Sequence, residues 1–291
     1  MASTGINLSE VRNFSDMFTA TFYFIKQEIK SLLTCFSVLV LPLVLVDLFI
    51  KSYAMNGLFL LRSAEAMHQY GVRGMALLLF SYVMTLILIY WLVLFVVSYL
   101  RVYHQKYRLE EKIKVLPGEV WTVMCRKMLK VFALSVVLSL VIVIGFIFLI
   151  IPGIYLAVIF SFSIYFLIIR DQTISGSLGA SKDLCDGQWW ALFGYTLLLQ
   201  LIVTMLAYVF AIPYMVIIFK AAFTGHAPGI FELTIGTLFT QLGQYLMYMI
   251  LFIGIGIRFF STLEQREHAT LLEKIEQIGA DAETERSEGS F

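Results

Sequence analysis

The polar residue most able to do chemistry is Asp47, the only acidic residue inside a long apolar run. A carboxylate at membrane depth is costly, and such residues often mark binding sites or ion pathways. Asp47 also lies near the end of its run, four residues before Lys51. An ion pair along a helix or a headgroup contact therefore explains it too. We favour this structural interpretation, and the functional one stays open.

A second polar feature follows one face of the last apolar run. Four polar residues recur there at spacings of four, three and four, which places them on one side of a helix. They are Thr237, Gln241, Gln244 and Tyr248. We expect this side to face other helices, because polar side chains inside a bilayer bond to one another. A solute or ion pathway needs the same stripe, but no ionisable residue accompanies it, which argues against a proton relay.

Small residues accompany the stripe at Gly236, Thr240 and Gly243. Such residues let two membrane helices approach closely and hydrogen-bond across the contact. Gln200, in the preceding apolar run, is the natural polar partner. The predicted polar face inside the membrane therefore comprises Gln200, Thr237, Gln241 and Gln244.

Catalytic and metal-binding signatures are missing from the sequence. The four histidines show no paired spacing and the three cysteines form no CxxC pair, which leaves no readable metal site, disulfide framework or catalytic triad. The glycines form no phosphate-binding pattern. We expect no enzyme activity, no metal and no cofactor. The residues concerned are His68, His104, His226, His268, Cys35, Cys125 and Cys185.

The composition indicates which elements position these residues. Of 291 residues, 60% are apolar and 14% are charged, against roughly 45–50% and roughly 25% in soluble domains. Uncharged runs near the length of about 20 residues that a membrane helix needs occur six times. They cover residues 31–50, 75–99, 131–150, 154–169, 191–212 and 233–257. We predict an all-α polytopic membrane protein, since helices satisfy every backbone group within lipid.

Prolines and charges set the expected limits of these runs. Pro152 and Gly153 predict a tight turn between the third and fourth helices, while Pro213 and Arg258 close the fifth and sixth. Seventeen Lys and Arg residues fall on the side of the two termini and four on the other. The positive-inside rule then places both termini in the cytoplasm. Nothing resembles a cleavable signal peptide, so we expect the first helix to remain.

The chain divides into four expected parts. Residues 1–30 form a cytoplasmic amphipathic segment and residues 31–257 the six-helix membrane domain. Residues 258–280 form a cytoplasmic amphipathic helix that stops at Gly279, and residues 281–291 are disordered. Each outward helix follows an amphipathic stretch that lies at the membrane interface, which suggests three degenerate repeats. A charged flank before any hydrophobic helix imitates such a unit, and this alternative stays open.

The cytoplasmic segments differ strongly in charge. Residues 101–130 carry about five net positive charges, and residues 258–291 carry eight acids against four bases. The basic segment is expected to attract anionic lipid headgroups or an acidic partner. We expect the acidic tail to dock on this segment or on another protein. The alternative, that the tail only keeps the cytoplasmic side soluble, stays open. The candidate headgroup or partner contacts are Arg101, Lys106, Arg108, Arg126, Lys127 and Lys130.

One region carries a family resemblance. Residues 149–156 read LIIPGIYL, an aromatic-rich run leads to Arg170 and Asp171, and the segments ISGSLGASKDL (174–184) and GQWW (187–190) follow. About residues 115–215 resemble the membrane domain of bacterial glycerophosphoryl diester phosphodiesterases and related bacterial six-helix proteins without an assigned function. The resemblance implies a helical domain of the bacterial inner membrane. It implies no catalytic residue here, because that family's phosphodiesterase chemistry lies in a separate soluble barrel.

These features predict a non-enzymatic integral membrane protein, an accessory or scaffold component that acts through its cytoplasmic face. The alternative is a small-solute or lipid transporter-like protein, which needs a cavity near the glutamine stripe. The expected partners are the lipid bilayer and, at the cytoplasmic face, a protein or an anionic lipid. The net charge of +1 gives no reason to expect nucleic-acid binding.

Overall fold

The computed structural model describes residues 5–60, 64–109, 114–226 and 228–288. These residues form helices and no strand. The helices run as α1 (Phe14–Leu39), α2 (Leu41–Leu60), α3 (Ala64–Arg108), α4 (Pro117–Phe148), α5 (Ile150–Ile159), α6 (Ser163–Ile169), α7 (Ile174–Cys185), α8 (Trp189–Thr224) and α9 (Ile230–Glu288). The prediction of an all-α fold is confirmed for this part of the chain.

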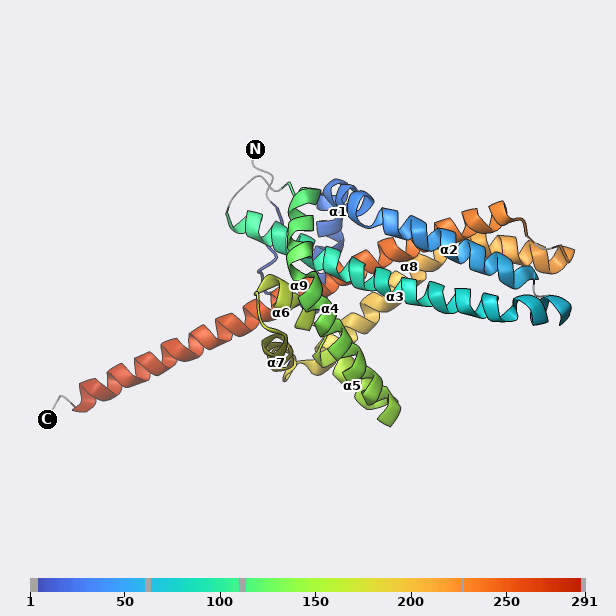
Figure 1. The fold of residues 1–291 in the computed structure, drawn as a ribbon. Coiled ribbons are helices and arrows are strands. Elements are labelled where there is room, and N and C mark those ends of the chain that lie inside the picture. The colour runs from blue at the N-terminus through green and yellow to red at the C-terminus, as the bar shows by residue number, and fades with distance from the viewer. Residues whose placement is uncertain (1–4, 61–63, 110–113, 227, 289–291) are drawn as a thin grey trace.

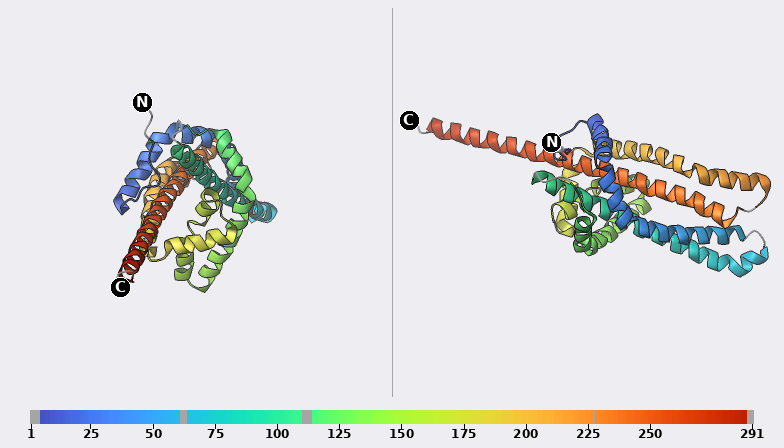
Figure 2. Two further views of the ribbon diagram at one scale, coloured as in Figure 1. Left: turned by 90° about the vertical axis from the view of Figure 1, so that its left-hand side faces the viewer. Right: turned by 90° about the horizontal axis from the view of Figure 1, so that it is seen from above.

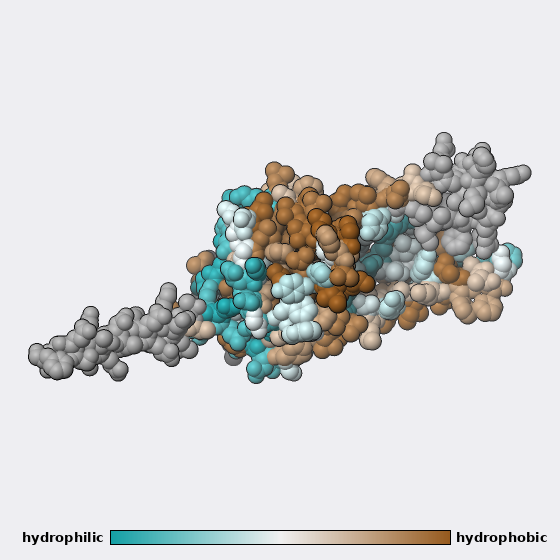
Figure 3. Space-filling model, turned by 90° about the horizontal axis from the view of Figure 1, so that it is seen from below, coloured by the Kyte–Doolittle hydropathy of each residue, from teal (hydrophilic) through white to brown (hydrophobic). Residues whose placement is uncertain are grey.

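Five helical segments are long and apolar enough to cross a membrane, and the α1–α2 pair adds a sixth if it counts as one bent span. The five are Met75–Arg108, Pro117–Phe148, Ile150–Ile169, Trp189–Thr224 and Phe231–Ala269. Figure 3 shows hydrophobic surface over most of the helical body, with hydrophilic residues gathered at one end. The fold therefore has the surface and the helices of a membrane protein.

The two hairpins α2–α3 and α8–α9 extend side by side and turn at the same end of the molecule (Figures 1 and 2). Helix α9 occupies the centre of this arrangement, where it packs against α1, α2, α3 and α8. The amphipathic α1 lies across the opposite end of the hairpins. Its buried side chains include Met17, Phe24 and Leu32, whose spacing corresponds to one helical face.

The first predicted span, residues 31–50, is wrong as a single straight helix. The chain bends by 56° between α1 and α2, and the break lies at Val40, before Pro42. Proline lacks the N–H that would bond four residues back and is tolerated in the first turn of a new helix. The part of the predicted span that runs alongside α3 is therefore α2, which begins at Leu41.

Two other helix ends also differ from the prediction. Helix α8 contains Pro213 and continues to Thr224, where Gly225 takes a left-handed conformation with φ of 67°. Helix α9 passes through Arg258 and through Gly279, the predicted stop, and reaches Glu288. Neighbouring helices can support a proline within a membrane helix, so Pro213 does not end α8. Most of the segment 281–291, expected to be disordered, is helical in the structure.

The turn between α4 and α5 lies at Leu149, not at the predicted Pro152–Gly153 pair. Leu149 is extended, with φ of −167° and ψ of 154°, and Pro152 falls in the first turn of α5. A side chain on Gly153 would place its Cβ 2.5 Å from the ring of Phe146. The glycine is needed for close helix packing, and a single extended residue makes the turn.

The α4–α5 hairpin runs across the α2–α3 and α8–α9 hairpins and not alongside them (Figures 1 and 2). The three predicted repeat units also differ in their helix breaks. The second unit is the continuous helix α4, the third is divided into α7 and α8 by a turn after Cys185, and the first bends at Val40. The spans therefore do not form one parallel bundle of identical units.

Candidate ligand-binding site among α2, α8 and α9

The polar stripe of α9 meets two different neighbours. Thr240, Gln244 and Tyr248 line a cavity against α8, whereas Tyr245 bonds to Asp47 of α2. Gln241 lies one helical turn from Tyr245 on the same face and is 3% exposed. The stripe therefore divides into a side that lines the cavity and a side that is buried against α2.

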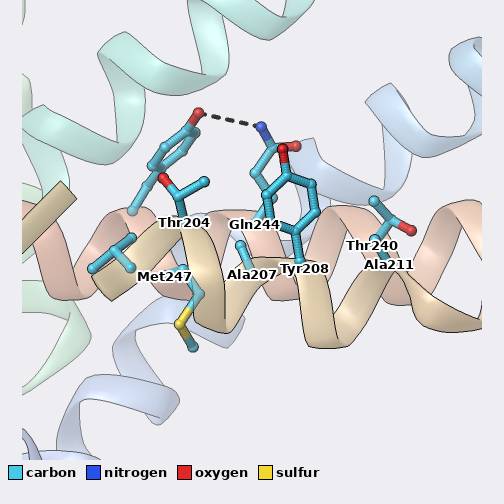
Figure 4. A pocket seen from close by; sticks show the side chains of 9 residues that line it. Thr204, Ala207, Tyr208, Ala211, Thr240, Gln244 and Met247 are labelled. Carbon is cyan, nitrogen blue, oxygen red and sulfur yellow. Dashed lines mark hydrogen bonds between the residues drawn. The ribbon is translucent and has the colours of Figure 1, made fainter. Parts of the chain in front are cut away.

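The cavity between α8 and α9 has a volume of about 310 Å³. It is lined by Val203, Thr204, Ala207, Tyr208, Ala211, Thr240, Gln244, Met247 and Tyr248. In Figure 4, Thr204, Tyr208 and Gln244 point to the same side of the two helices. Gln244 donates from Nε2 to the Tyr248 hydroxyl at 3.3 Å. The lining thus combines hydroxyl and amide groups with apolar walls, and the described residues that form it include no charged side chain.

Small residues shape this cavity. Along α8, Ala207 and Ala211 are one turn apart on the lining face, so little side-chain volume fills the space. Along α9, Gly236 and Gly243 bring the backbone onto Tyr214 and Phe210, where an added Cβ would lie 3.0 Å and 2.2 Å from the nearest atom of those residues. The glycines therefore provide the close helix contact that their sequence pattern indicated.

The other two predicted members of the polar face are engaged within their own helices. Gln200 donates from Nε2 to Thr204 at 3.0 Å, and Thr237 donates to the carbonyl of Leu233 at 2.7 Å. Gln200 therefore borders the cavity through Thr204, a hydrogen-bond partner on its own helix α8. Tyr208 of α8 lines the cavity although its sequence context gave no polar periodicity that pointed to it.

Asp47 forms a buried cluster with residues of α2, α3 and α9. Its Oδ2 accepts an ion pair from Lys51 at 2.8 Å and a hydrogen bond from the Tyr245 hydroxyl at 3.1 Å. Thr85 of α3 adjoins the same hydroxyl. The Lys51 pair agrees with the structural interpretation, but the Asp47 side chain is 0% exposed, so it makes no headgroup contact.

The position of Asp47 along its helix also differs from the prediction. Because α2 begins at Leu41 and continues to Leu60, Asp47 lies two turns inside the helix and not near its end. The packing also brings this ionisable pair against the α9 stripe. Within α9 no ionisable residue accompanies the stripe, but the assembled helices bring Asp47 and Lys51 of α2 against it, so the prediction of a stripe without an ionisable neighbour is wrong.

Two members of the cluster keep unpartnered polar atoms. Oδ1 of Asp47 and both side-chain polar atoms of Gln241 are buried and make no hydrogen bond to the described residues. Most buried polar atoms in proteins have a partner, because burial without one costs about 1–3 kcal/mol. The cluster therefore combines a satisfied ion pair with a set of buried donors and acceptors that lack partners.

A second charged cluster lies where α3, α4 and α6 meet. Arg101 donates to both carboxylate oxygens of Asp171, at 2.9 Å and 2.6 Å, and Lys127 pairs with the same carboxylate. The hydrogen bond from Arg101 is the main reason that the pKa of Asp171 falls to about 2, with Lys127 adding to it. Asp171 has a φ of 55°, a left-handed conformation that aspartate tolerates better than most residues.

The six predicted headgroup contacts therefore divide into two groups. Arg101 and Lys127 are engaged by Asp171, and Lys106 pairs with Glu119 at 2.7 Å. Arg108, Arg126 and Lys130 are exposed. Arg126 and Lys130 are one turn apart on α4, and the side chain of Leu129 next to Lys130 is also exposed. The free part of the basic segment is thus smaller than its charge suggested.

The described part of the acidic tail contacts α6 and α7. Arg266 donates to the carbonyls of Asp183 and Asp186, at 2.7 Å and 2.9 Å, and Glu267 pairs with Arg170. These contacts differ from the predicted docking on residues 101–130. Beyond them α9 extends away from the helical body (Figure 1).

Metal-ligating side chains do not converge in the described residues, where no group of three His, Cys, Asp or Glu residues is found. His104 stacks with Phe260 at 4.8 Å between ring centroids. Cys35 and Cys185 are buried and Cys125 is exposed. Within the described chain, the cavity and the Asp47 cluster are therefore the features best suited to hold a ligand.

A family model matches residues 118–263 of this chain, which is half of its length. The chain belongs to that family, the domain of unknown function DUF7847. No curated protein and no solved structure matches it. The DUF7847 region contains the α8–α9 cavity, Tyr245, Lys127 and Asp171, whereas Asp47, Lys51 and Arg101 precede it. Each of the two clusters is therefore completed by residues from outside the family region.

Proposed function

We propose that this DUF7847 member is a non-enzymatic integral membrane protein that holds an amphipathic, lipid-like molecule in the α8–α9 cavity. The observation that carries the proposal is the cavity of about 310 Å³ between two membrane helices. Its walls combine apolar side chains with a few hydroxyl and amide groups, the composition expected of a small-molecule site. Its volume lies at the lower end of such sites, about 300–1,000 Å³.

The lining chemistry favours a neutral polar group joined to an apolar chain. Thr204, Tyr208, Thr240, Gln244 and Tyr248 offer donors and acceptors but no charge. Tyr208 lines the cavity and is 63% exposed on the outer surface of α8. A lipid-like molecule would enter from the bilayer beside Tyr208 and place its hydroxyl or ester group near Gln244.

The proposal assumes six membrane crossings with the bent α1–α2 pair as the first and with both termini in the cytoplasm. The uneven distribution of Lys and Arg supports this orientation. The resemblance of residues 115–215 to bacterial six-helix membrane proteins supports the bacterial inner membrane as the location. A descent from three degenerate repeats is part of the same proposal, and the amphipathic stretch that precedes each outward helix in the sequence supports it.

The cavity can be tested by filling it. The full chain is purified in mild detergent, and the retained lipids are quantified by mass spectrometry against the bulk lipid extract. Ala207→Phe places a ring in the cavity, whereas Ala222→Phe makes the same change at an exposed position of α8. We expect the native chain and Ala222→Phe to retain one enriched lipid class and Ala207→Phe to lose it. Equal retention by both variants, or no enrichment in the native chain, contradicts the proposal.

A role as an accessory or scaffold component is the second candidate. Arg126 and Lys130 are exposed on α4 next to the exposed side chain of Leu129, a combination suited to anionic lipid headgroups or to an acidic protein segment. The test is binding of the purified chain to vesicles with and without anionic lipid. Arg126→Gln with Lys130→Gln should remove the difference between the two vesicle types, while Arg108→Gln serves as the exposed basic control.

A further inference from the structure

The Asp47 cluster contains buried hydrogen-bonding atoms that make no hydrogen bond within the described structure. Both partners of Asp47, Lys51 and Tyr245, bond to Oδ2, and Oδ1 is buried without a partner. One turn along α9, the carbonyl and amide of Gln241 are also buried and unpartnered. Two acceptors, Oδ1 of Asp47 and Oε1 of Gln241, and the Nε2 donor group of Gln241 therefore remain without a hydrogen bond among the described residues. A purely structural salt bridge does not require these additional groups.

We propose that this cluster is a binding site for a primary ammonium group. The ammonium would donate to Oδ1 of Asp47 and to Oε1 of Gln241, which lack donors at present. Nε2 of Gln241 would donate to an oxygen of the same molecule, such as a hydroxyl or phosphate oxygen. The site is distinct from the uncharged cavity against α8 and would take a different chemical class of ligand.

The buried negative charge of Asp47 explains the role of Lys51. Asp47 is fully buried and needs a cation, because an unpaired carboxylate in a low-dielectric interior is very costly. Lys51 supplies this cation but is 23% exposed at its side chain, and it lies one turn from Asp47 toward the far end of α2. A long lysine side chain can extend toward the headgroups. Lys51 therefore neutralises Asp47 through Oδ2 when no ligand is bound, and it shares the carboxylate charge with the ammonium when the ammonium binds Oδ1.

The same molecule shows that one carboxylate can serve two cations. Asp171 binds Arg101 and Lys127 together through its two oxygens. At Asp47 only one oxygen is used, and the second oxygen is available for a second donor. The difference is that Asp171 is half exposed to solvent, whereas Asp47 is buried. An added ammonium at Asp47 would thus compete with Lys51 more strongly than the two cations compete at Asp171.

The test uses the full chain in phosphatidylcholine nanodiscs and measures thermal unfolding with ethylammonium chloride. Tetramethylammonium chloride at the same ionic strength is the matched control, because it has the charge but no N–H donor. We expect ethylammonium to raise the unfolding temperature in a saturable way and tetramethylammonium to have no saturable effect. Equal effects of both salts, or no effect of either, overturn the proposal.

Two substitutions separate a binding site from a structural ion pair. Asp47→Asn should reduce the apparent affinity for ethylammonium at least about tenfold, because it removes a buried charge partner. Lys51→Gln should increase this affinity, because it removes the internal competitor. If Asp47→Asn does not fold, Lys51→Gln alone decides, since an unchanged or weaker affinity in this variant overturns the proposal.

The ammonium group could belong to a free amine or to a lipid headgroup, and a second arm distinguishes these sources. The native chain and Asp47→Asn are equilibrated with equal amounts of phosphatidylethanolamine and phosphatidylcholine of the same chain length. Retention of phosphatidylethanolamine by the native chain alone assigns the site to a lipid headgroup. Equal retention of both lipids, together with the ethylammonium response, assigns it to a free amine.

Discussion

The Tyr245 hydroxyl of α9 donates a hydrogen bond to Oδ2 of Asp47 in α2 at 3.1 Å, although 198 positions separate the two residues in the chain. This bond joins α9 to α2 and fixes the polar face of α9 against an ion pair. It also explains why a carboxylate can lie two turns inside α2. The arrangement leads to the first of four predictions.

Tyr245→Phe should lower the stability of the chain by about 1–3 kcal/mol, because it removes a donor from a buried carboxylate. Thermal unfolding in detergent measures the change. Tyr208→Phe is the control, since this tyrosine is largely exposed and its loss should alter stability by less than about 0.5 kcal/mol. A Tyr245→Phe variant as stable as Tyr208→Phe would show that the bond to Asp47 does not support the fold.

Gly243→Val should destabilise the contact between α8 and α9. Any Cβ at this position lies 2.2 Å from Phe210, and overpacking of this kind costs about 1–3 kcal/mol or more. At Gly194 of α8 an added Cβ meets no atom within 4 Å, so Gly194→Ala should be neutral or slightly stabilising through helix propensity. Unfolding temperatures of the two variants check the prediction. A neutral Gly243→Val would contradict the close helix contact.

Asp171→Asn should destabilise the junction of α3, α4 and α6 at neutral pH by about 1 kcal/mol, the size expected for a partly exposed ion pair. The pKa of Asp171 falls from an ordinary 3.8 to about 2 in the folded chain. Its contribution is therefore complete above about pH 4 and disappears as the pH falls through about 2. Asparagine also tolerates the left-handed backbone, so the substitution isolates the charge. Between pH 7 and pH 2 the unfolding curves of the native chain and of Asp171→Asn should converge at the acidic end. A difference in stability that stays constant over this range would contradict the prediction.

Cys125 and Cys185 should differ sharply in their rates of reaction with maleimide. Burial raises the pKa of the Cys185 thiol to about 12, and this thiol hydrogen-bonds to the carbonyl of Ile159 at 3.4 Å. Cys125 is exposed. The folded chain should therefore label at Cys125 and react at Cys185 only after denaturation, since the thiolate is the reactive form. Peptide mapping after timed labelling gives the rates, and comparable rates at both positions would contradict the buried position of Cys185.

Much of the candidate site could be predicted from helical periodicity. The spacing of Gln241, Gln244 and Tyr248 placed them on one face of a helix, and Gly236 and Gly243 indicated a close helix contact. Periodicity could not show which neighbour each residue meets. Gln244 lines the α8 cavity while Gln241 lies on the side that packs against α2, because a stripe of this width covers the contacts with two adjacent helices.

The basic segment shows a similar limit. Its net charge marked residues 101–130 as a surface for acidic groups, and the structure assigns Arg101 and Lys127 to Asp171 of the same chain. A count of charges contains no information on which pairs the fold satisfies internally. Exposed Arg126 and Lys130 are what remains of that surface on α4.

The sequence by itself determined that this chain is helical and carries enough apolar length to cross a membrane several times, because backbone groups in lipid must bond within helices. It also determined the polar face of the last helix, because side-chain direction follows the helical period. Only the tertiary structure decided that Asp47 and Lys51 lie against that face and that Val40 divides the first predicted span. Such contacts depend on how helices far apart in the chain pack together, and no local pattern specifies that packing.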